Sequence, residues 1–182
     1  MKKFVLLIAI MAIIIGCSHV DDYYPFAVGN KWNYRHTKIT PTDTFINSVD
    51  MEITGTTIMG GKEVWVRAET WPIDTTTYEQ TTYIEETENY IITYLIMEGE
   101  TLTDTLVSFP LEERKTWGNY VATAPETVTV PAGTYTDCWK ITANLGYGYG
   151  AYWYLASNVG VVKSVFGGYD IIILELEESS IK

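Results

Sequence analysis

Short runs of β-branched and aromatic residues, separated by Gly, Pro, Asn or Asp, recur along most of the chain. Such runs are typical of β-strands, and the breaks between them are typical of turns. The pattern predicts ten or more strands, at Lys31–Ile39, Phe45–Thr54, Lys62–Thr70, Thr76–Glu85, Tyr90–Met97, Thr101–Phe109, Glu126–Val130, Thr134–Leu145, Tyr149–Ala156, Val161–Phe166 and Tyr169–Glu177.

Many short sequential strands joined by brief turns predict an all-β fold, an antiparallel meander that must curl or close to bury its apolar face. We expect a strongly curved sheet or barrel rather than a sandwich, because no Cys–Trp–Cys immunoglobulin spacing is present. The fold has room for at most one or two short helices, and Leu111–Trp117 is predicted as one. Tyr90–Met97 is apolar on both faces and is expected to be a central strand buried on both sides.

The first residues predict export. Lys2 and Lys3 precede an unbroken apolar run at 4–15, which is too short to span a bilayer, and Gly16 supplies a small residue before a cleavage site. Residues 14–17, Ile-Ile-Gly-Cys, resemble the bacterial lipobox. The resemblance implies a lipoprotein signal at 1–16, cleavage between Gly16 and Cys17, and acylation of Cys17.

The remaining chain is expected to have two parts, a lipidated tether at 17–22 and a single β-domain at 23–182. The predicted location is therefore the cell envelope, where the lipid on Cys17 would anchor the protein to a membrane. Ser18, rather than Asp, follows the lipidation site. In a cell with two membranes, Ser18 favours the outer one.

The net charge of −11 argues against a nucleic-acid partner, since phosphate binding relies on a basic surface. Removal of Lys2 and Lys3 with the signal leaves the chain more acidic still. We interpret this charge as a contribution to solubility.

Glycines alternate at the start of one predicted strand. Tyr147, Tyr149 and Trp153 are expected on one face of residues 146–155, and Gly146, Gly148 and Gly150 on the other, since side chains alternate with a period of two. The bare backbone strip predicts sharp curvature or the floor of a ligand groove for a lipid, glycan or peptide.

No catalytic set is recognisable. The chain has only two histidines, one of them in the tether, so multi-histidine metal sites are not expected, and no metal or cofactor is predicted. Cys138, unpaired once Cys17 carries lipid, is expected to be a buried inert thiol, with a Cys138–His36 nucleophilic pair as the alternative. Carboxylates cluster at Glu85–Glu88, Glu112–Glu113 and Glu175–Glu178, where solvated charge is the expected role.

Three segments carry a further resemblance. Residues 23–34 are similar to a YYPLAVGNxWxY segment, residues 128–138 to a VPAGTY/F segment, and residues 152–163 to a YWYxxxVGxVK segment, all found in uncharacterised bacterial envelope lipoproteins. The resemblance implies an all-β lipoprotein domain, and the curved half-barrels of lipoprotein carriers are an analogy of shape only.

These observations favour a membrane-anchored envelope lipoprotein with a non-catalytic binding or scaffold domain. Two alternatives remain open. One is a subunit or adaptor of an envelope assembly, which would bind an envelope protein partner through an exposed strand edge. The other is a carboxylate-based hydrolase of envelope glycans, which requires two carboxyl groups about 5–9.5 Å apart in a cleft.

Overall fold

The computed structural model describes residues 23–73, 76–146 and 149–182, and all its regular elements are strands. No helix in this part of the chain could cross a membrane. The strands are β1 Lys31–Ile39, β2 Thr44–Met59, β3 Lys62–Ile73, β4 Thr76–Glu86, β5 Tyr90–Met97, β6 Glu100–Ser108, β7 Thr116–Trp117, β8 Tyr120–Val130, β9 Gly133–Gly146, β10 Tyr149–Ala156, β11 Gly160–Gly167 and β12 Ile171–Ser180.

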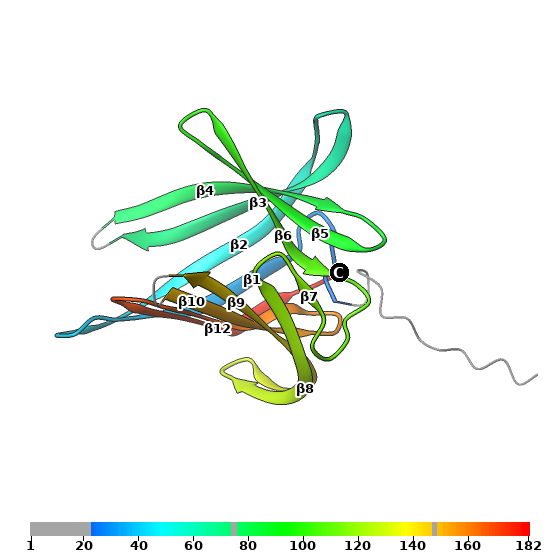
Figure 1. Ribbon diagram of the computed structural model, residues 1–182. Helices are drawn as coiled ribbons and strands as arrows, with labels where there is room; N and C mark the ends of the chain where they lie inside the picture. The colour runs from blue at the N-terminus through cyan, green and yellow to red at the C-terminus, as the bar shows by residue number, and fades with distance from the viewer. Residues whose placement is uncertain (1–22, 74–75, 147–148) are drawn as a thin grey trace, which may run out of the picture.

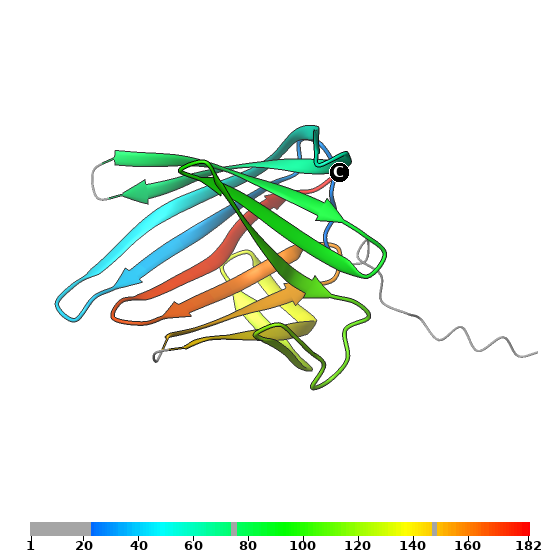
Figure 2. The same ribbon diagram turned by 45° about the horizontal axis from the view of Figure 1, so that its top comes forward.

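The twelve strands form one antiparallel sheet that curls into a nearly closed barrel (Figures 1 and 2). Its order is β6-β5-β4-β3-β2-β1-β12-β11-β10-β9-β8-β7, so β1 and β12 pair and join the two halves of the meander. The predicted all-β meander with a strongly curved sheet is confirmed. The Gly60–Gly61 pair makes the β2–β3 turn with φ of 57° and 82°, values that L side chains rarely adopt.

The two ends of the barrel carry different segments. The β1–β2, β3–β4, β5–β6, β9–β10 and β11–β12 turns lie at one end, which we call the hairpin end. The opposite end, here the terminal end, carries the start of β1, the end of β12 and the β2–β3, β4–β5 and β10–β11 turns (Figure 1).

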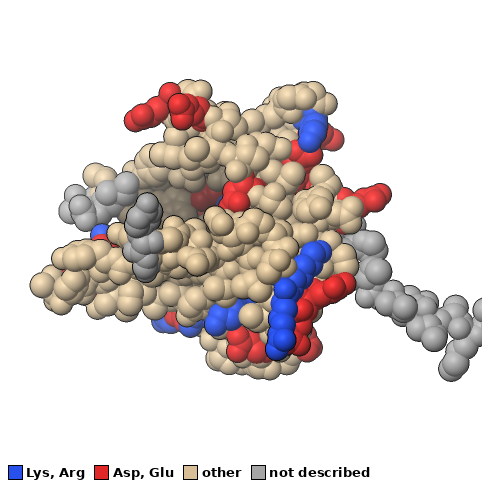
Figure 3. Space-filling model, viewed as in Figure 1, with Lys and Arg blue, Asp and Glu red and all other residues tan. Residues whose placement is uncertain are grey.

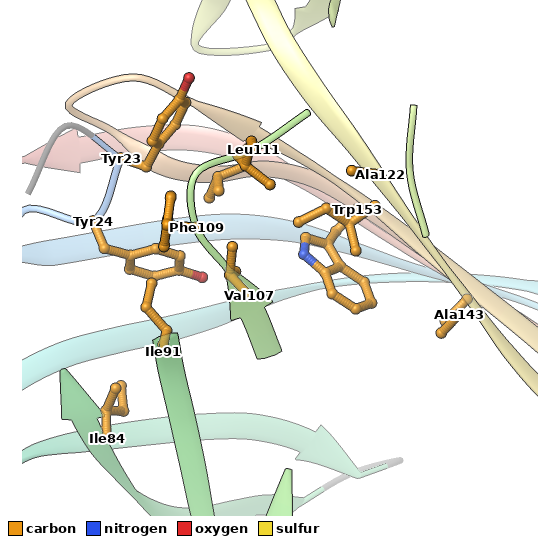
Figure 4. Close-up of a cluster of buried hydrophobic side chains, with 13 residues drawn as sticks. Tyr23, Tyr24, Ile84, Ile91, Val107, Phe109, Leu111, Ala122, Ala143 and Trp153 are labelled. Atoms are coloured by element: carbon orange, nitrogen blue, oxygen red, sulfur yellow. The ribbon is translucent and has the colours of Figure 1, made fainter. Parts of the chain in front are cut away.

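Apolar side chains fill the barrel toward the terminal end. Tyr23 and Tyr24, which precede β1, pack in one buried cluster with Phe109 and Leu111 from the β6–β7 connection. Figure 4 shows these residues between Ile84 and Ile91 on one side and Trp153 on the other. The terminal end is therefore filled by the segments that enter and cross it.

The barrel does not close through a backbone ladder. In the described chain, β6 pairs with β5 and β7 pairs with β8, and side chains span the seam between the two edges. Trp117 Nε1 donates to the Thr105 carbonyl at 2.9 Å, and the Tyr120 hydroxyl donates to the Asp104 carboxylate.

The prediction of a helix at Leu111–Trp117 is wrong. Arg114 has a φ of 65°, and its N–H donates to the Ala122 carbonyl at 2.8 Å, while Ala122 N–H donates back to the Lys115 carbonyl. The segment pairs with β8 and ends in β7 instead of forming a helical turn.

The prediction that Tyr90–Met97 is buried on both sides is also wrong. This strand, β5, is second from the edge of the sheet, and only Ile91 within it is fully buried. Tyr90 and Ile96, on the face opposite Ile91, are exposed, and so is Met97 at the end of the strand.

Candidate ligand-binding site

The concave face of the sheet encloses a cavity of about 380 Å³. Figure 3 shows the hollow between the two halves of the sheet, with acidic atoms inside it. Its walls are mostly apolar and rich in aromatic side chains from both halves and from the segment before β1. The aromatic lining residues are Tyr24, Phe26, Trp32, Tyr34, Trp71, Tyr120, Trp153 and Phe166.

Period-two alternation places the β1 and β10 side chains in this cavity. Trp32 and Tyr34 alternate with outward residues along β1, and Ala151 and Trp153 do the same along β10. Trp32 Nε1 donates to the Val159 carbonyl at 2.7 Å, and the Tyr34 hydroxyl has a similar partner in β11. These bonds fix the two rings as rigid parts of the wall.

A buried ion pair lies in the wall formed by β3. Arg67 Nε and Nη2 both donate to Glu69 Oε1, at 3.0 and 2.8 Å, and Thr82 donates to the same oxygen at 2.5 Å. Trp71 Nε1 donates to the other carboxylate oxygen, Oε2, at 2.8 Å. The Glu69 side chain is 3% exposed, so its charge is stabilised by these partners and not by water.

The environment of this pair favours the charged forms. Burial alone would raise the pKa of Glu69, but Arg67 and the hydrogen bonds from Thr82 and Trp71 outweigh it and hold that pKa below its usual value. Burial raises the pKa of the neighbouring Tyr24 to about 12, so its hydroxyl stays protonated. The cavity thus contains a fixed ion pair and a neutral phenol.

A second, more polar cavity of about 320 Å³ adjoins the first across β3 to β6. The two share Arg67, Glu69, Asp104 and Leu106. The additional lining residues are mainly hydroxyl and amide side chains: Gln80, Thr82, Thr93 and Thr103, with Leu95 and Leu102. The concave face therefore has an aromatic region and an adjacent region with hydrogen-bonding groups.

One buried donor in the aromatic region is unused. Trp153 is 6% exposed, and its Nε1 has no hydrogen-bond partner among the described residues. An unpaired buried N–H costs free energy, so a ligand carbonyl or hydroxyl within reach of it would be stabilised.

Residues 146–155, predicted to form one strand with a groove, do not lie on a single strand: Gly146 ends β9, and β10 begins at Tyr149. Trp153 lines the cavity, whereas Tyr149 is exposed at the hairpin end. Gly146, with a φ of 76°, pairs with Tyr149, and Gly150 pairs with Asn144 after a register shift. Tyr147 and Gly148 lie outside the described residues, as do Gly16 and Cys17.

The cavity lies on the aromatic face of β10 and not on the glycine face. Tyr152 and Tyr154, which alternate with Trp153, lie near Lys140, whose Nζ is 4.4 Å from the Tyr152 ring centre. Sequence reasoning missed the pair formed by Arg67 and Glu69. The sequence does contain a signal for it: Trp65, Arg67, Glu69 and Trp71 occur at every second position of one strand, which places two charges on an aromatic face.

Cys138 is a buried thiol whose Sγ donates to the Tyr135 carbonyl at 3.4 Å. Burial raises its pKa, which disfavours the reactive thiolate. The described partners of Cys138 Sγ are the Tyr135 and Thr136 carbonyls, whereas the His36 ring packs edge-on against Trp71. Burial, and then the nearby Lys38 charge, lower the pKa of His36, which favours the neutral form of the imidazole.

The carboxylate clusters noted in the sequence serve ion pairs. Glu85 binds Lys62 at 2.7 Å, and Glu175 binds both Arg35 and Lys163, at 2.8 and 2.9 Å. Across residues 23–73, 76–146 and 149–182, no group of three His, Cys, Asp or Glu side chains is placed to hold a metal ion.

Acid is expected to destabilise the domain partly through Glu69 and Glu85. Hydrogen bonds from Lys62 and then Tyr94 lower the pKa of Glu85, as the ion pair lowers that of Glu69, both from 4.5. A lowered folded-state pKa contributes stability above the unfolded value of 4.5, and this is lost as the pH falls through the folded value.

Urea unfolding from neutral pH down to about pH 3 measures this loss. The Glu69→Gln variant should show a slope below pH 4.5 that is shallower by up to about 1.4 kcal/mol per pH unit. Glu52→Gln, which changes an exposed carboxyl group, is the control. A slope in Glu69→Gln equal to that of the wild type would contradict the lowered pKa of Glu69 in the folded protein.

No protein-family model matches the chain, and no curated protein matches it in sequence. Two solved structures do share its fold. The first, a "putative exported protein with YmcC-like fold" from Bacteroides fragilis, has a TM-score of 0.58 at 12% identity. The second, a "putative lipoprotein" from Parabacteroides distasonis, has a TM-score of 0.56 at 10% identity.

Each likeness covers 87% of this chain and 99% of the other. Because both identities are low, the likeness concerns architecture and not activity. The chain therefore has the curved antiparallel fold of these two bacterial proteins.

Proposed function

We propose that this chain is a lipid-anchored envelope protein whose β-domain binds an amphipathic ligand without catalysis. The observation that carries the proposal is the 380 Å³ aromatic cavity with its adjoining polar region. This volume lies within the range of small-molecule sites, which are mostly apolar with a few polar groups. The apolar part of the ligand would contact the tryptophans, and its polar part the threonine side chains.

The anchor rests on the sequence. The Ile-Ile-Gly-Cys ending of the signal supports acylation of Cys17, and the three segments similar to envelope lipoproteins support the same class. The names of the two proteins that share the fold, exported protein and lipoprotein, agree with this location. We assign the outer membrane, if the cell has two, because Ser18 follows Cys17.

Tryptophan quenching by a brominated monoacylglycerol tests the cavity. Trp32, Trp71 and Trp153, three of the six tryptophans, line it. Saturating ligand is therefore expected to quench roughly half of the tryptophan emission, because a bound acyl chain would contact these three rings and leave the others in their protein environment.

A blocked cavity provides the matched comparison. Ala143→Leu adds apolar volume inside the cavity, whereas Thr142→Leu adds it to the neighbouring residue on the other face of β9. Affinity should fall about tenfold or more in the first variant and stay unchanged in the second, with folding of both checked by thermal unfolding. Equal quenching curves for the two variants would contradict the proposal.

A further inference from the structure

Exposed apolar side chains are concentrated at one end of the barrel. Fourteen large hydrophobic residues of the described chain are exposed, and eleven of them lie at the hairpin end. We call these eleven the hairpin rim: Phe45, Ile46, Tyr78, Ile96, Met97, Leu102, Leu145, Tyr149, Phe166, Tyr169 and Ile171. The other three, Val28, Ile58 and Tyr90, lie at the terminal end.

The rim is continuous with the cavity. Leu145 and Phe166 are 51% and 41% exposed, yet both line the aromatic region. Tyr24, Phe109 and Leu111 fill the terminal end. The cavity therefore opens at the hairpin end, and its opening is bordered by exposed apolar side chains.

The segment before the domain cannot cover this rim once it has been processed. Cleavage before Cys17 leaves six residues ahead of Tyr23, which reach at most about 20 Å. The described chain starts at the terminal end, and β2, with 16 residues, runs about 50 Å from the rim to that end. The processed segment ahead of Tyr23 is therefore too short to reach the rim.

The chemistry of the rim suits a lipid surface. Its apolar side chains project from separate hairpins, and three are tyrosines, which suit a membrane interface because one end is apolar and the other polar. Lys38, next to the β1–β2 turn, is paired with Asp170 at 3.1 Å, so it adds no free basic charge. The same end carries exposed carboxylates at Asp43, Glu79, Glu98 and Glu100, which an anionic surface would repel. Figure 3 shows acidic atoms on the projecting end at the upper left of the view. An uncharged lipid surface matches this rim better than an anionic one.

We propose that the hairpin rim docks on a second phospholipid bilayer, facing the membrane that holds the anchor. The inference rests on the proposed function, since the anchor places the terminal end at the first membrane. A docked rim would bring the cavity opening against lipid, so that an amphipathic ligand could enter with little exposure to water.

Capture of one vesicle by another tests the docking. Lipidated full-length protein is reconstituted into dense vesicles, and fluorescent phosphatidylcholine vesicles without protein are added before sedimentation. The wild-type protein is expected to sediment the fluorescent vesicles. Ile46→Ser combined with Tyr169→Ser should reduce capture at least about tenfold, because two exposed apolar side chains leave the lipid contact.

Ile58→Ser combined with Tyr90→Ser is the matched control, since it makes the same chemical change at the terminal end. It should retain wild-type capture. The proposal is overturned if the wild type captures no vesicles, if both double variants capture equally, or if the dense vesicles only aggregate with one another through rim-to-rim contacts. None of the four substituted residues lines the aromatic cavity, so quenching by the brominated lipid reports separately on ligand binding.

Discussion

Replacing Glu69 by Gln is expected to lower the free energy of unfolding by about 3–5 kcal/mol, the usual effect of removing one partner of a buried ion pair. The side chains of Glu69 and Arg67 are only 3% and 16% exposed, so water cannot replace the lost carboxylate. The Gln amide would also bring a second donor toward N–H groups of Arg67 or Trp71. Urea unfolding at neutral pH measures the change.

Two controls separate the buried charge from the loss of a contact. In Arg67→Met combined with Glu69→Leu both charges disappear, so this double variant should be more stable than Glu69→Gln. Lys31→Met breaks the pair with Glu52, whose side chains are 59% and 39% exposed, and should cost no more than about 1 kcal/mol. A Glu69→Gln variant that loses no more stability than Lys31→Met would rule out the buried pair.

Replacing Cys17 by Ala is expected to abolish acylation of the protein completely. The mature wild type should begin at Cys17 and carry the mass of two or three acyl chains, whose buried methylene groups contribute about 0.8 kcal/mol each to membrane affinity. Intact mass spectrometry of protein extracted from membranes measures both the start of the chain and its added mass.

Cys138→Ala is the matched control for this substitution. It removes the only other cysteine, which is buried in the domain, and should leave the acyl mass unchanged. A mature wild-type chain that starts at another residue, or that has no added mass at Cys17, would refute the anchor.

Most strands were predictable because local pattern and tertiary structure agree. The predicted bounds of β1, β5 and β10 match the structure, since turn residues flank each apolar run. The predicted β8 was too short: it began at Glu126, whereas the strand begins at Tyr120. Residues 120–123 pair with β9 in regular register, but register shifts between Thr123 and Glu126 and between Glu126 and Val128 then interrupt the period-two alternation.

Helix propensity at 111–117 was overridden by packing. The residues Glu112 to Lys115 favour helix locally, but Leu111 is buried in the core and Arg114 bonds to β8. These contacts are distant in sequence, so no local pattern could reveal them.

The candidate site was predictable only in part. Alternation placed Trp153 on the aromatic face of its strand, and the structure places it in the cavity. The size of the cavity depends on how β3 and β10, which do not pair, face each other across the curved sheet. Strand periodicity carries no information about that distance.

The seam between β6 and β7 has a consequence for the circumference of the barrel. Elsewhere neighbouring strands share ladders of backbone hydrogen bonds, but here Trp117 and Tyr120 bridge the edges through side chains. Breaking a hydrogen bond of this kind costs about 0.5–1.5 kcal/mol, far less than separating a ladder. The seam is therefore the part of the circumference whose width is set by side chains and not by backbone pairing.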